Sequence, residues 1–324
     1  MQGSPVKPFD DMRALIGAMP IADTKSVAKT QDRLEKALGG LQPLGRLSRG
    51  VAWLAGWQEK KFPQINKPLV AVFMATHGVA VDIIGGDLNA RAQKRLKMLS
   101  EGSAAVRGIA AAQGAAFKVY EMGLSEPCAD MRTQPSLSER ECAAAIAFGM
   151  ETLAEGADII ALGCAGVGSA AAAAGIARGL YGGTASYWAG GHDAHAALRT
   201  KAVETAAKLH KNVLGDPLEV LRHFGGRDIA GMVGTIIAAG HQKTPILLDG
   251  FVVCAAAAIV HGINKDGLSH CMAAHLSAEP AHGALLDRIN KKPLLDYAIG
   301  VGDGSGAALA LGALKAATAG ALTV

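Results

Sequence analysis

Glycine-rich turns follow short apolar runs in this 324-residue chain, and turns of that kind can hold a phosphate group. They lie at residues 163–169, 249–250 and 300–306. Glycine lets the backbone approach a ligand closely, and a helix after the turn offers free N–H groups and a positive dipole end to an anion. The pattern predicts a site for a phosphorylated small molecule, unless the glycines only tighten turns between strands and helices.

The turn at residues 163–169 has other interpretations. The spacing of Gly163, Gly166 and Gly168 is not the G-x-G-x-x-G of a dinucleotide site, and the ribose-binding carboxylate of that signature is missing. Cys164 is predicted at a helix N-terminus, where a thiol pKa falls and the sulfur becomes more nucleophilic. Because the sequence shows no partner base, we do not favour a catalytic cysteine.

Further polar residues near the turns have simpler interpretations. Asp249 ends an apolar run and is predicted to cap the helix that begins near Gly250. His192 and His195 have a spacing that suits a metal ion, but no third ligand is nearby, which favours a solvated loop. We expect neither a metal ion nor a cofactor.

Recurring apolar runs are the elements that must position these turns. The runs cover residues 68–74, 115–121, 157–162, 244–249, 270–275 and 297–301. Stretches long enough for helices separate them, which predicts an α/β fold with a doubly wound, mostly parallel sheet flanked by helices. In such sheets ligands bind at the carboxyl ends of the strands, where the glycine turns lie.

The segments outside this alternation are predicted to be a helical annex and one covering loop. Residues 27–38 and 47–60 have helical patterns on either side of a turn at 42–45. Residues 182–195 are rich in glycine and serine, include Tyr187 and Trp188, and resemble a loop that covers something.

Composition narrows the class of protein. Half the residues are hydrophobic but only 4% are aromatic, a balance typical of a helix-coated parallel sheet. The net charge of +4 with dispersed Lys and Arg argues against nucleic acid as a partner. The five cysteines include no C-x-x-C, which favours a reducing, cytoplasmic location.

Neither a signal peptide nor a membrane span is expected. Residues 1–10 are polar and lack the charged region and apolar run of a signal peptide. The alanine-rich stretches at 169–177 and 304–324 are interrupted by glycine, Arg178 and Lys315, so we interpret them as buried helices.

A set of motifs then resembles one family in order and spacing. The motifs lie at residues 224–232, 245–251, 275–280 and 302–310, with weaker similarities at 43–47, 77–79 and 136–150. Together they resemble the nicotinate-nucleotide–dimethylbenzimidazole phosphoribosyltransferases, which make α-ribazole phosphate for the lower loop of cobamides. The resemblance covers nearly the whole chain.

The resemblance implies an architecture and a reaction. Residues 67–310 would form the doubly wound nucleotide-binding domain, and residues 1–66 and 311–324 a small helical domain, in a homodimer. The reaction moves the phosphoribosyl group of nicotinate mononucleotide to a benzimidazole nitrogen with inversion at the anomeric carbon. It releases nicotinate and needs no metal.

The resemblance also assigns site residues. Asp303 would be the general base, and His77, Lys94 and Val301 would bind the base. The phosphate and nucleotide would be held by Gly163, Cys164, Gly166, Gly168, Ser277, Gly302, Gly304 and Ser305, with Arg199 or Lys201 in the place of a family lysine. Ser277 also suits a helix N-cap, with Pro280 near the first turn.

Departures from the family pattern affect the expected chemistry. Asp303 replaces a glutamate, so its oxygen reaches roughly 1.5 Å less far, and catalysis tolerates a ~1 Å misplacement badly. The turn at 163–171 lacks a carboxylate and three polar side chains of the family. Lys94, in place of a glutamine, lies among Arg91, Arg95 and Lys97, which otherwise suit a solvated helix face.

These departures leave three functional hypotheses. The first is a phosphoribosyltransferase acting on nicotinate mononucleotide. The second is a non-catalytic paralogue that keeps the nucleotide site, favoured by the missing polar residues and opposed by the carboxylate of Asp303. The third is a transferase with a different acceptor, suggested by the region around Lys94.

Overall fold

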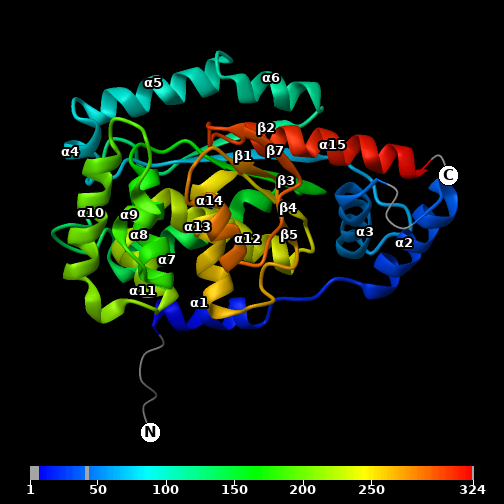
Figure 1. The fold of residues 1–324 in the computed structure, drawn as a ribbon, viewed down its shortest axis with the longest axis horizontal. Coiled ribbons are helices and arrows are strands. Elements are labelled where there is room, and N and C mark those ends of the chain that lie inside the picture. The colour runs from blue at the N-terminus through cyan, green and yellow to red at the C-terminus, as the bar shows by residue number, and fades with distance from the viewer. Residues whose placement is uncertain (1–6, 41–43, 323–324) are drawn as a thin grey trace, which may run out of the picture.

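A five-stranded parallel sheet forms the centre of the computed structural model, which describes residues 7–40 and 44–322 (Figure 1). Its strands, in the order β2-β1-β3-β4-β5, are β1 (Pro68–Met74), β2 (Ala116–Glu121), β3 (Ile159–Cys164), β4 (Ile246–Leu248) and β5 (Cys271–Ala273). Each strand lies within or overlaps one of the apolar runs, and all pairings are parallel. The predicted fold class is confirmed.

The last apolar run, at 297–301, does not join this sheet. It overlaps β7 (Leu295–Ile299), which pairs with β6 (His275–Ser277) in a separate two-stranded parallel sheet. Strands β1 and β3 of the central sheet are buried at every position, whereas Tyr297 is 71% exposed. The short apolar pattern at 297–301 indicated a strand, but it did not indicate which sheet the strand joins.

Helices cover both faces of the central sheet, which explains why β1 is apolar at every position. Alternate β1 residues enter two different cores: Leu69, Ala71 and Phe73 pack in one, and Val70, Val72 and Met74 in the other. The first core is built with α7 (Glu139–Met150), α8 (Ser169–Tyr181), α11 (Pro217–Phe224), α12 (Arg227–His241) and α13 (Gly250–Ile263). The second is built with α5 (Leu88–Glu101), α6 (Ala105–Ala112) and α15 (Ser305–Leu322).

The remaining helices extend this body. They are α1 (Pro8–Gly17), α2 (Thr24–Leu38), α3 (Arg46–Gln58), α4 (Ala80–Ile84), α9 (Ala185–Ala189), α10 (Ala196–Leu209) and α14 (His282–Arg288), with short 3₁₀ turns at Glu151–Leu153 and Lys211–Val213. The segment 182–195 is therefore not only a loop. It contains α9, because Trp188 is buried at 1% exposure and anchors that turn of helix.

Helices α2 and α3 from the N-terminal part of the chain pack together with the C-terminal helix α15. Helix α2 packs on α3, and α3 packs on α15, whereas α1 lies against α7 and α13 (Figure 1). Helix α15 runs unbroken across the proposed domain boundary at 310/311. Residues 1–6, 42–43 and 323–324 of the sequence-based assignments lie outside the described residues, and the division at 66/67 and 310/311 stays a proposal.

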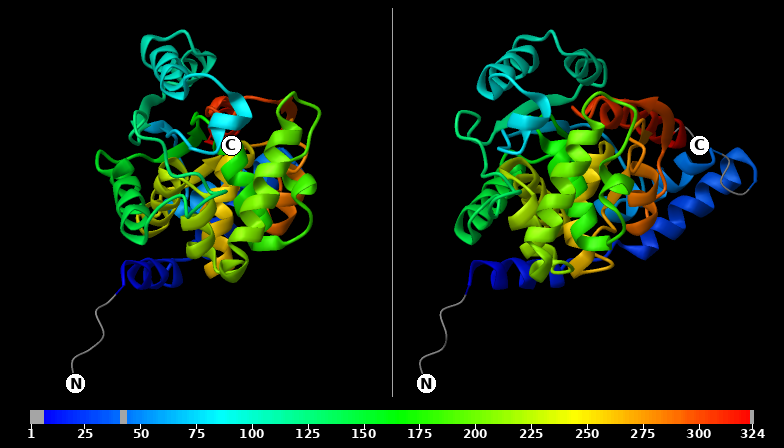
Figure 2. Two further views of the ribbon diagram at one scale, coloured as in Figure 1. Left: turned by 90° about the vertical axis from the view of Figure 1, so that its left-hand side faces the viewer. Right: turned by 60° about the vertical axis from the view of Figure 1, so that its left-hand side comes forward.

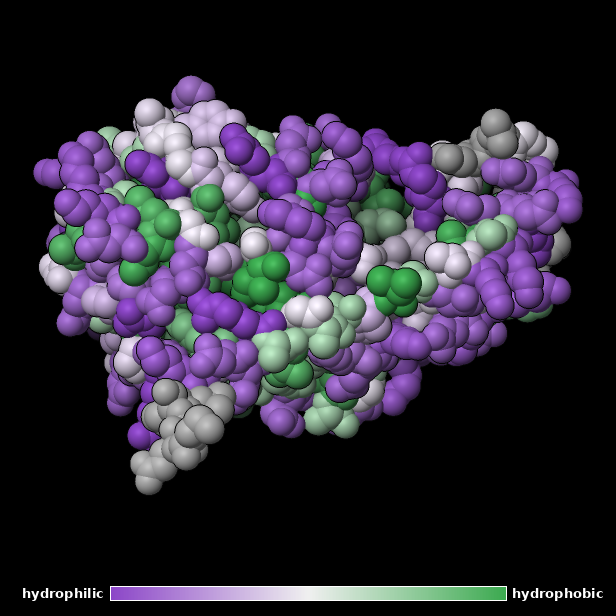
Figure 3. Space-filling model, turned by 90° about the horizontal axis from the view of Figure 1, so that it is seen from below, coloured by the Kyte–Doolittle hydropathy of each residue, from purple (hydrophilic) through white to green (hydrophobic). Residues whose placement is uncertain are grey.

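Two features of the outer surface bear on the sites below. Helices α5 and α6 form an outlying layer beyond the sheet (Figure 2). Seen from below, the surface is largely hydrophilic, including the end of the molecule where α2 lies (Figure 3). None of the helices in the described parts of the chain has the length and apolar character needed to cross a membrane.

Candidate functional site

The loops after β1 and β3 meet at the point where the strand order reverses, which is where open α/β sheets bind ligands. The Thr76 and Val167 backbones form an isolated parallel bridge there. The His77 N–H donates to the Val167 carbonyl at 3.0 Å, and the Val167 N–H donates to the Ala75 carbonyl at 2.9 Å. These contacts fix the turn that leads into α8.

A close backbone contact brings the turn before α15 to the end of β3. A Cβ added to Gly163 would lie 2.4 Å from the Gly304 nitrogen and 2.7 Å from the Asp303 carbonyl carbon. The Cys164 N–H donates to the Gly302 carbonyl at 2.8 Å. Only glycine at 163 permits this approach, and it sets the position of Asp303.

We expect Gly163→Ala to lower kcat at least about tenfold and to destabilise the fold by about 1–3 kcal/mol, because the new methyl group meets backbone that cannot rotate away. Steady-state kinetics and urea unfolding would measure both effects. Gly108→Ala is the matched control, since a Cβ at this α6 position has no atom within 4 Å. Wild-type kinetics in Gly163→Ala would contradict the positioning role.

Asp249 anchors the same turn, and this corrects its predicted role. It precedes α13 but makes no side-chain cap bond to that helix. Its carboxylate instead accepts the Gly304 N–H at 2.9 Å and the Ala307 N–H at 2.7 Å, at the start of α15. The free N–H groups of a first helical turn attract a carboxylate, and tertiary packing brings those of α15 closest.

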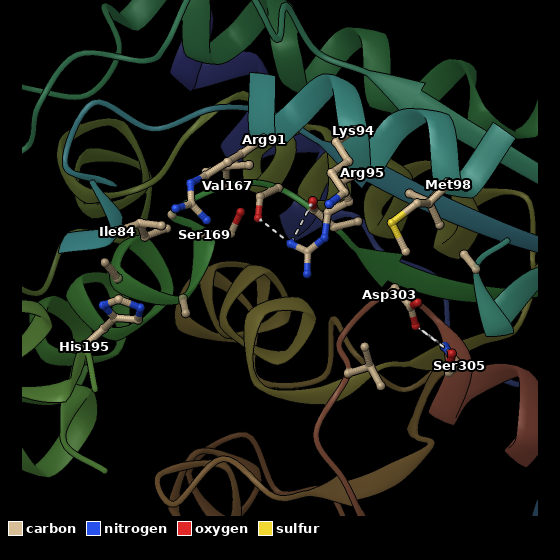
Figure 4. Close-up of a pocket in the computed structure, with 18 of the residues that line it drawn as sticks. Ile84, Arg91, Lys94, Arg95, Met98, Val167, Ser169, His195, Asp303 and Ser305 are labelled. Carbon is tan, nitrogen blue, oxygen red and sulfur yellow. Dashed lines mark hydrogen bonds between the residues drawn. The ribbon is translucent and has the colours of Figure 1, made fainter. Parts of the chain in front are cut away.

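Asp303 is half-buried at the mouth of this turn. Its Oδ1 accepts hydrogen bonds from the Ser305 N–H at 3.1 Å and from the Ser305 hydroxyl at 2.6 Å. Among the described residues Oδ2 has no hydrogen-bond partner, so it can accept a proton from a ligand. Both Asp303 and Ser305 line a cavity of about 670 Å³ (Figure 4).

A row of cations on α5 forms the opposite wall of this cavity (Figure 4). Arg95 donates to the carbonyls of Ala165 and Gly166, both at 3.3 Å, and so ties α5 to the β3–α8 turn. Arg91 and Lys94 have no ion-pair partner within the described residues. All three cations are exposed, which agrees with the predicted solvated helix face, and they also line the cavity.

A smaller compartment of about 170 Å³ adjoins the large cavity and shares Arg95, Gly166, Ser169, Ala170 and Val301 with it. Its walls include the first residues of α8 and α13, whose N-termini favour an anion. Glu279 also lines it. Burial raises the pKa of the Glu279 carboxyl, Arg199 lowers it and Asp193 raises it, with a net upward shift.

The structure gathers most of the sequence-predicted site residues around these two spaces. The larger cavity takes Lys94, Gly166, Gly168, Arg199, Val301, Asp303 and Ser305, and the smaller one Cys164, Gly166, Ser277, Val301 and Gly302. Gly163 and Gly304 form the backbone contact behind them. His77 and Lys201 line neither space.

His77 lies in a buried polar cluster that the sequence did not reveal. Its Nε2 lies 3.0 Å from Oδ1 of Asp228, and the Ser169 hydroxyl donates to Oδ2 of Asp228 at 2.6 Å. Burial opposes ionisation of Asp228, but His77, Ser169 and the Ile229 N–H together hold its pKa below the usual value. This cluster fixes the β1 loop against α8 and α12.

The expectation of an acidic thiol at Cys164 is wrong. Cys164 ends β3, five residues before α8 begins at Ser169, so no helix N-terminus acts on it. Burial, followed by the nearby Asp228 carboxylate, raises its thiol pKa. The sulfur donates to Asp228 at 3.5 Å and is no nucleophile.

The predicted N-cap role of Ser277 is also wrong. Ser277 is the last residue of β6, and α14 begins only at His282 with Ala281 at its N-cap. Its hydroxyl accepts the Glu279 N–H at 3.4 Å, and it lines the smaller compartment.

Arg199 and Lys201, the alternative partners for a phosphate, have different surroundings on α10. Arg199 is buried, donates to Asp193 at 2.8 Å and to the Ala189 carbonyl at 2.9 Å, and lowers the pKa of Asp193 to about 2. Lys201 is exposed.

His195, at the start of α10, lines the large cavity. The described residues hold no group of three side chains suited to a metal ion.

We expect Arg199→Ala to weaken nucleotide binding by about 1.5–3 kcal/mol, the range for hydrogen bonds to charged groups, because Arg199 lines the larger cavity. Lys201→Ala, two residues along the same helix, is the matched control and should bind as the wild type does. Titration calorimetry with nicotinate mononucleotide measures both. Equal affinities in all three proteins would remove α10 from the nucleotide site.

Arg95, Glu279 and Asp228 are the residues that sequence reasoning missed. Glu279 and Asp228 lie within the motifs at 275–280 and 224–232, yet nothing in the local pattern indicates that one reaches the compartment and the other a buried histidine. Arg95 stands in a run of charges that commonly faces solvent. Only the packing of distant segments distinguishes them.

Comparisons with known proteins point to one family of enzymes. A family model described as a phosphoribosyltransferase matches residues 19–322. The nicotinate-nucleotide–dimethylbenzimidazole phosphoribosyltransferase of Methylocella silvestris is 45% identical over 316 residues, which cover 96% of this chain and 93% of that protein. The enzyme of that name from Brucella anthropi is 43% identical over 317 residues, with the same coverage.

A solved structure is similar along most of its length. The crystal structure of nicotinate-nucleotide–dimethylbenzimidazole phosphoribosyltransferase from Thermus thermophilus superposes with a TM-score of 0.82 at 28% identity. The match covers 91% of this chain and 95% of the other.

Proposed function

This chain belongs to the nicotinate-nucleotide–dimethylbenzimidazole phosphoribosyltransferase family, and on that premise we propose how its site carries out the family reaction. It transfers the phosphoribosyl group of nicotinate mononucleotide to a benzimidazole-type base and yields an α-ribazole phosphate for cobamide synthesis. The observation that carries the assignment is Asp303, a carboxylate with one free oxygen in a cavity that opens into an anion-binding compartment.

The phosphate end of the nucleotide fits the smaller compartment. The N-termini of α8 and α13 supply backbone N–H groups, and Ser277 supplies a hydroxyl. Both bases then lie in the larger cavity, where Ile83, Ile84, Met98 and Leu99 provide apolar contacts. The anomeric carbon is thereby placed between the two spaces, within reach of the Asp303 turn.

In the reaction, a nitrogen of the acceptor attacks the anomeric carbon as the bond from that carbon to the nicotinate nitrogen breaks. The proton on the acceptor's other ring nitrogen passes to Oδ2 of Asp303, which is general-base work. The electron pair of the broken bond leaves with nicotinate, and the product has the inverted configuration. The negative charge of Asp303 also stabilises the cationic transition state.

Glu279 supplies a second carboxylate in place of the one that the turn at 163–171 lacks. It lines the smaller compartment and has no hydrogen-bond or ion-pair partner for its carboxylate among the described residues. A carboxylate there suits the ribose hydroxyls or the positive charge that develops on the sugar.

A turnover assay with nicotinate mononucleotide and dimethylbenzimidazole tests the function. Mass spectrometry should show the α-ribazole phosphate and an equal amount of released nicotinate. Nucleotide binding without product from any base would favour the non-catalytic hypothesis instead.

A different acceptor is the second candidate, and one observation favours it. Arg91 and Lys94 line the cavity without an ion-pair partner in the described chain, so an acceptor with an acidic substituent would fit. Benzimidazole carboxylic acids in the same assay, beside purines and phenols, distinguish this candidate by the ratio of kcat/KM values.

The quaternary and cellular settings are part of the proposal. Family membership supports a homodimer in the cytoplasm, with a small helical domain from residues 1–66 and 311–324. Sedimentation equilibrium would test the dimer.

A further inference from the structure

One face of α2, far from the substrate cavity, carries a concentration of positive charge. Its residues 29, 32, 33, 36 and 37 recur at helical spacing and line a groove of about 540 Å³ together with Lys61. Lys29, Arg33, Lys36 and Lys61 are cations, and the only carboxylate in the lining, Asp32, pairs with Lys36 at 2.8 Å. The groove therefore holds an excess of positive charge.

Arg33 is the unusual member of this groove. All three guanidinium nitrogens are enclosed, and none has a hydrogen-bond partner. The guanidinium lies over the Phe62 ring, 4.4 Å from its centre, and Lys61 lies over the same ring at 5.0 Å. Burial lowers the pKa of Arg33, although an arginine stays charged.

An enclosed charge without a partner costs free energy, and proteins almost always satisfy such groups. Aromatic contact offsets part of that cost but forms no hydrogen bond. An acceptor from outside the described residues would satisfy the guanidinium, and the excess of positive charge in the groove favours an anion.

We propose that Arg33, Lys29, Lys36 and Lys61 form a second anion site, which binds a ligand with a phosphate group. The planar fork of an arginine matches phosphate oxygens, and lysines add point charges around it. The four cations and the single carboxylate of Asp32 leave more positive charge than one carboxylate ligand would neutralise. A phosphate, which carries up to two negative charges, matches this excess better.

This site is separate from the proposed active site. It shares no lining residue with either substrate compartment, and α2 lies at the opposite end of the molecule from α10 (Figure 1). The α2 end of the surface is hydrophilic (Figure 3). A ligand bound in this groove does not compete with the nucleotide for the substrate site.

Lysine protection tests the site directly, with pyrophosphate as the added anion. Mass spectrometry after brief acetylation should show that pyrophosphate slows labelling of Lys29 and Lys61 at least about threefold in the wild-type protein. Arg33→Met, which keeps the contact with Phe62, should abolish that protection. Labelling of Lys94 reports the substrate cavity separately.

Thermal unfolding gives an independent readout with an unusual sign. Without pyrophosphate, Arg33→Met should raise Tm by about 2 °C, because an enclosed, unpaired charge is gone. With pyrophosphate, the wild-type Tm should rise above that of the variant, because a ligand of the native state stabilises it. Lys292→Met, an exposed position with the same change in charge, is the matched control.

Lys61→Met provides a second variant that does not alter α2, and it should also weaken protection of Lys29. The proposal would be overturned if pyrophosphate slowed lysine labelling in both variants as much as in the wild type and left the order of the wild-type and variant Tm values unchanged. The proposal would also be overturned if Arg33→Met dissociated the dimer while pyrophosphate still protected the lysines. A carboxylate of another chain would then be the partner of Arg33.

Discussion

Replacing Asp303 by asparagine is expected to lower kcat by a factor of about 10²–10⁴, with little change in the Kd for nicotinate mononucleotide. The amide oxygen can still accept the hydrogen bonds that Ser305 donates to Oδ1, so the turn before α15 keeps its shape. The substitution therefore removes the proton acceptor without changing the shape of the turn. Stopped-flow kinetics and titration calorimetry separate turnover from affinity.

Two further variants sharpen this result. Asp296→Asn removes a carboxylate on β7 that lines neither compartment, and it should turn over at the wild-type rate. Asp303→Glu restores the longer reach and should raise activity with dimethylbenzimidazole if the shorter acid is a handicap. If the site has repacked around aspartate for another acceptor, glutamate should be worse with that acceptor. Undiminished kcat in Asp303→Asn would exclude Asp303 as the base.

Acidification is expected to destabilise the protein strongly through two buried histidines. Burial lowers the pKa of His270 to about 3, with Lys291 and His241 adding to the effect, and burial together with His275 lowers that of His282 to about 3. The His270 ring donates to the Ile236 carbonyl, and Nδ1 of His282 accepts the Ser277 N–H. Both rings are therefore neutral in the fold.

Proton linkage gives the direction in which stability changes with pH. Below the unfolded value of 6.5 the unfolded chain binds a proton that the fold refuses, so stability falls as the pH drops from about 6.5 towards about 3. At pH 5 each histidine removes about 2 kcal/mol relative to neutral pH, or about 4 kcal/mol for the pair. Urea unfolding at pH 7.5 and pH 5 measures the difference.

Substitutions assign that loss to particular rings. His270→Gln keeps a donor for the Ile236 carbonyl and should remove about half of the pH dependence. His192→Gln, on the exposed surface, should leave it unchanged. A His270→Gln protein with the full wild-type dependence on pH would show that His270 is not buried in neutral form.

The strand pattern was readable because its cause is local. A strand covered on both faces must be apolar throughout, and residues 68–74 show this without interruption. The glycine turns were readable for a similar reason, since Gly168 and Gly304 adopt positive φ values of 95° and 96° that other residues rarely adopt. Family motifs then indicated the reaction and the place of Asp303.

Several roles depended instead on which distant segments come together. Asp249 looked like a cap for the helix that follows it, but the fold brings the first turn of α15 to its carboxylate. Cys164 looked activated, but burial beside Asp228 has the opposite effect on its thiol. The run at 297–301 indicated a strand, and only its pairing with β6 placed it outside the main sheet.

The sequence by itself determined the fold class and the family reaction, and it predicted a ligand site at the strand ends. Those properties follow from periodicity, turn geometry and motif spacing, which act within a few residues of each other. The tertiary structure alone decided that Arg95 bridges to the β3–α8 turn, that Glu279 lines the smaller compartment and that Arg33 lacks a partner. Burial and hydrogen bonding across long sequence separations set these properties, and no local pattern encodes them.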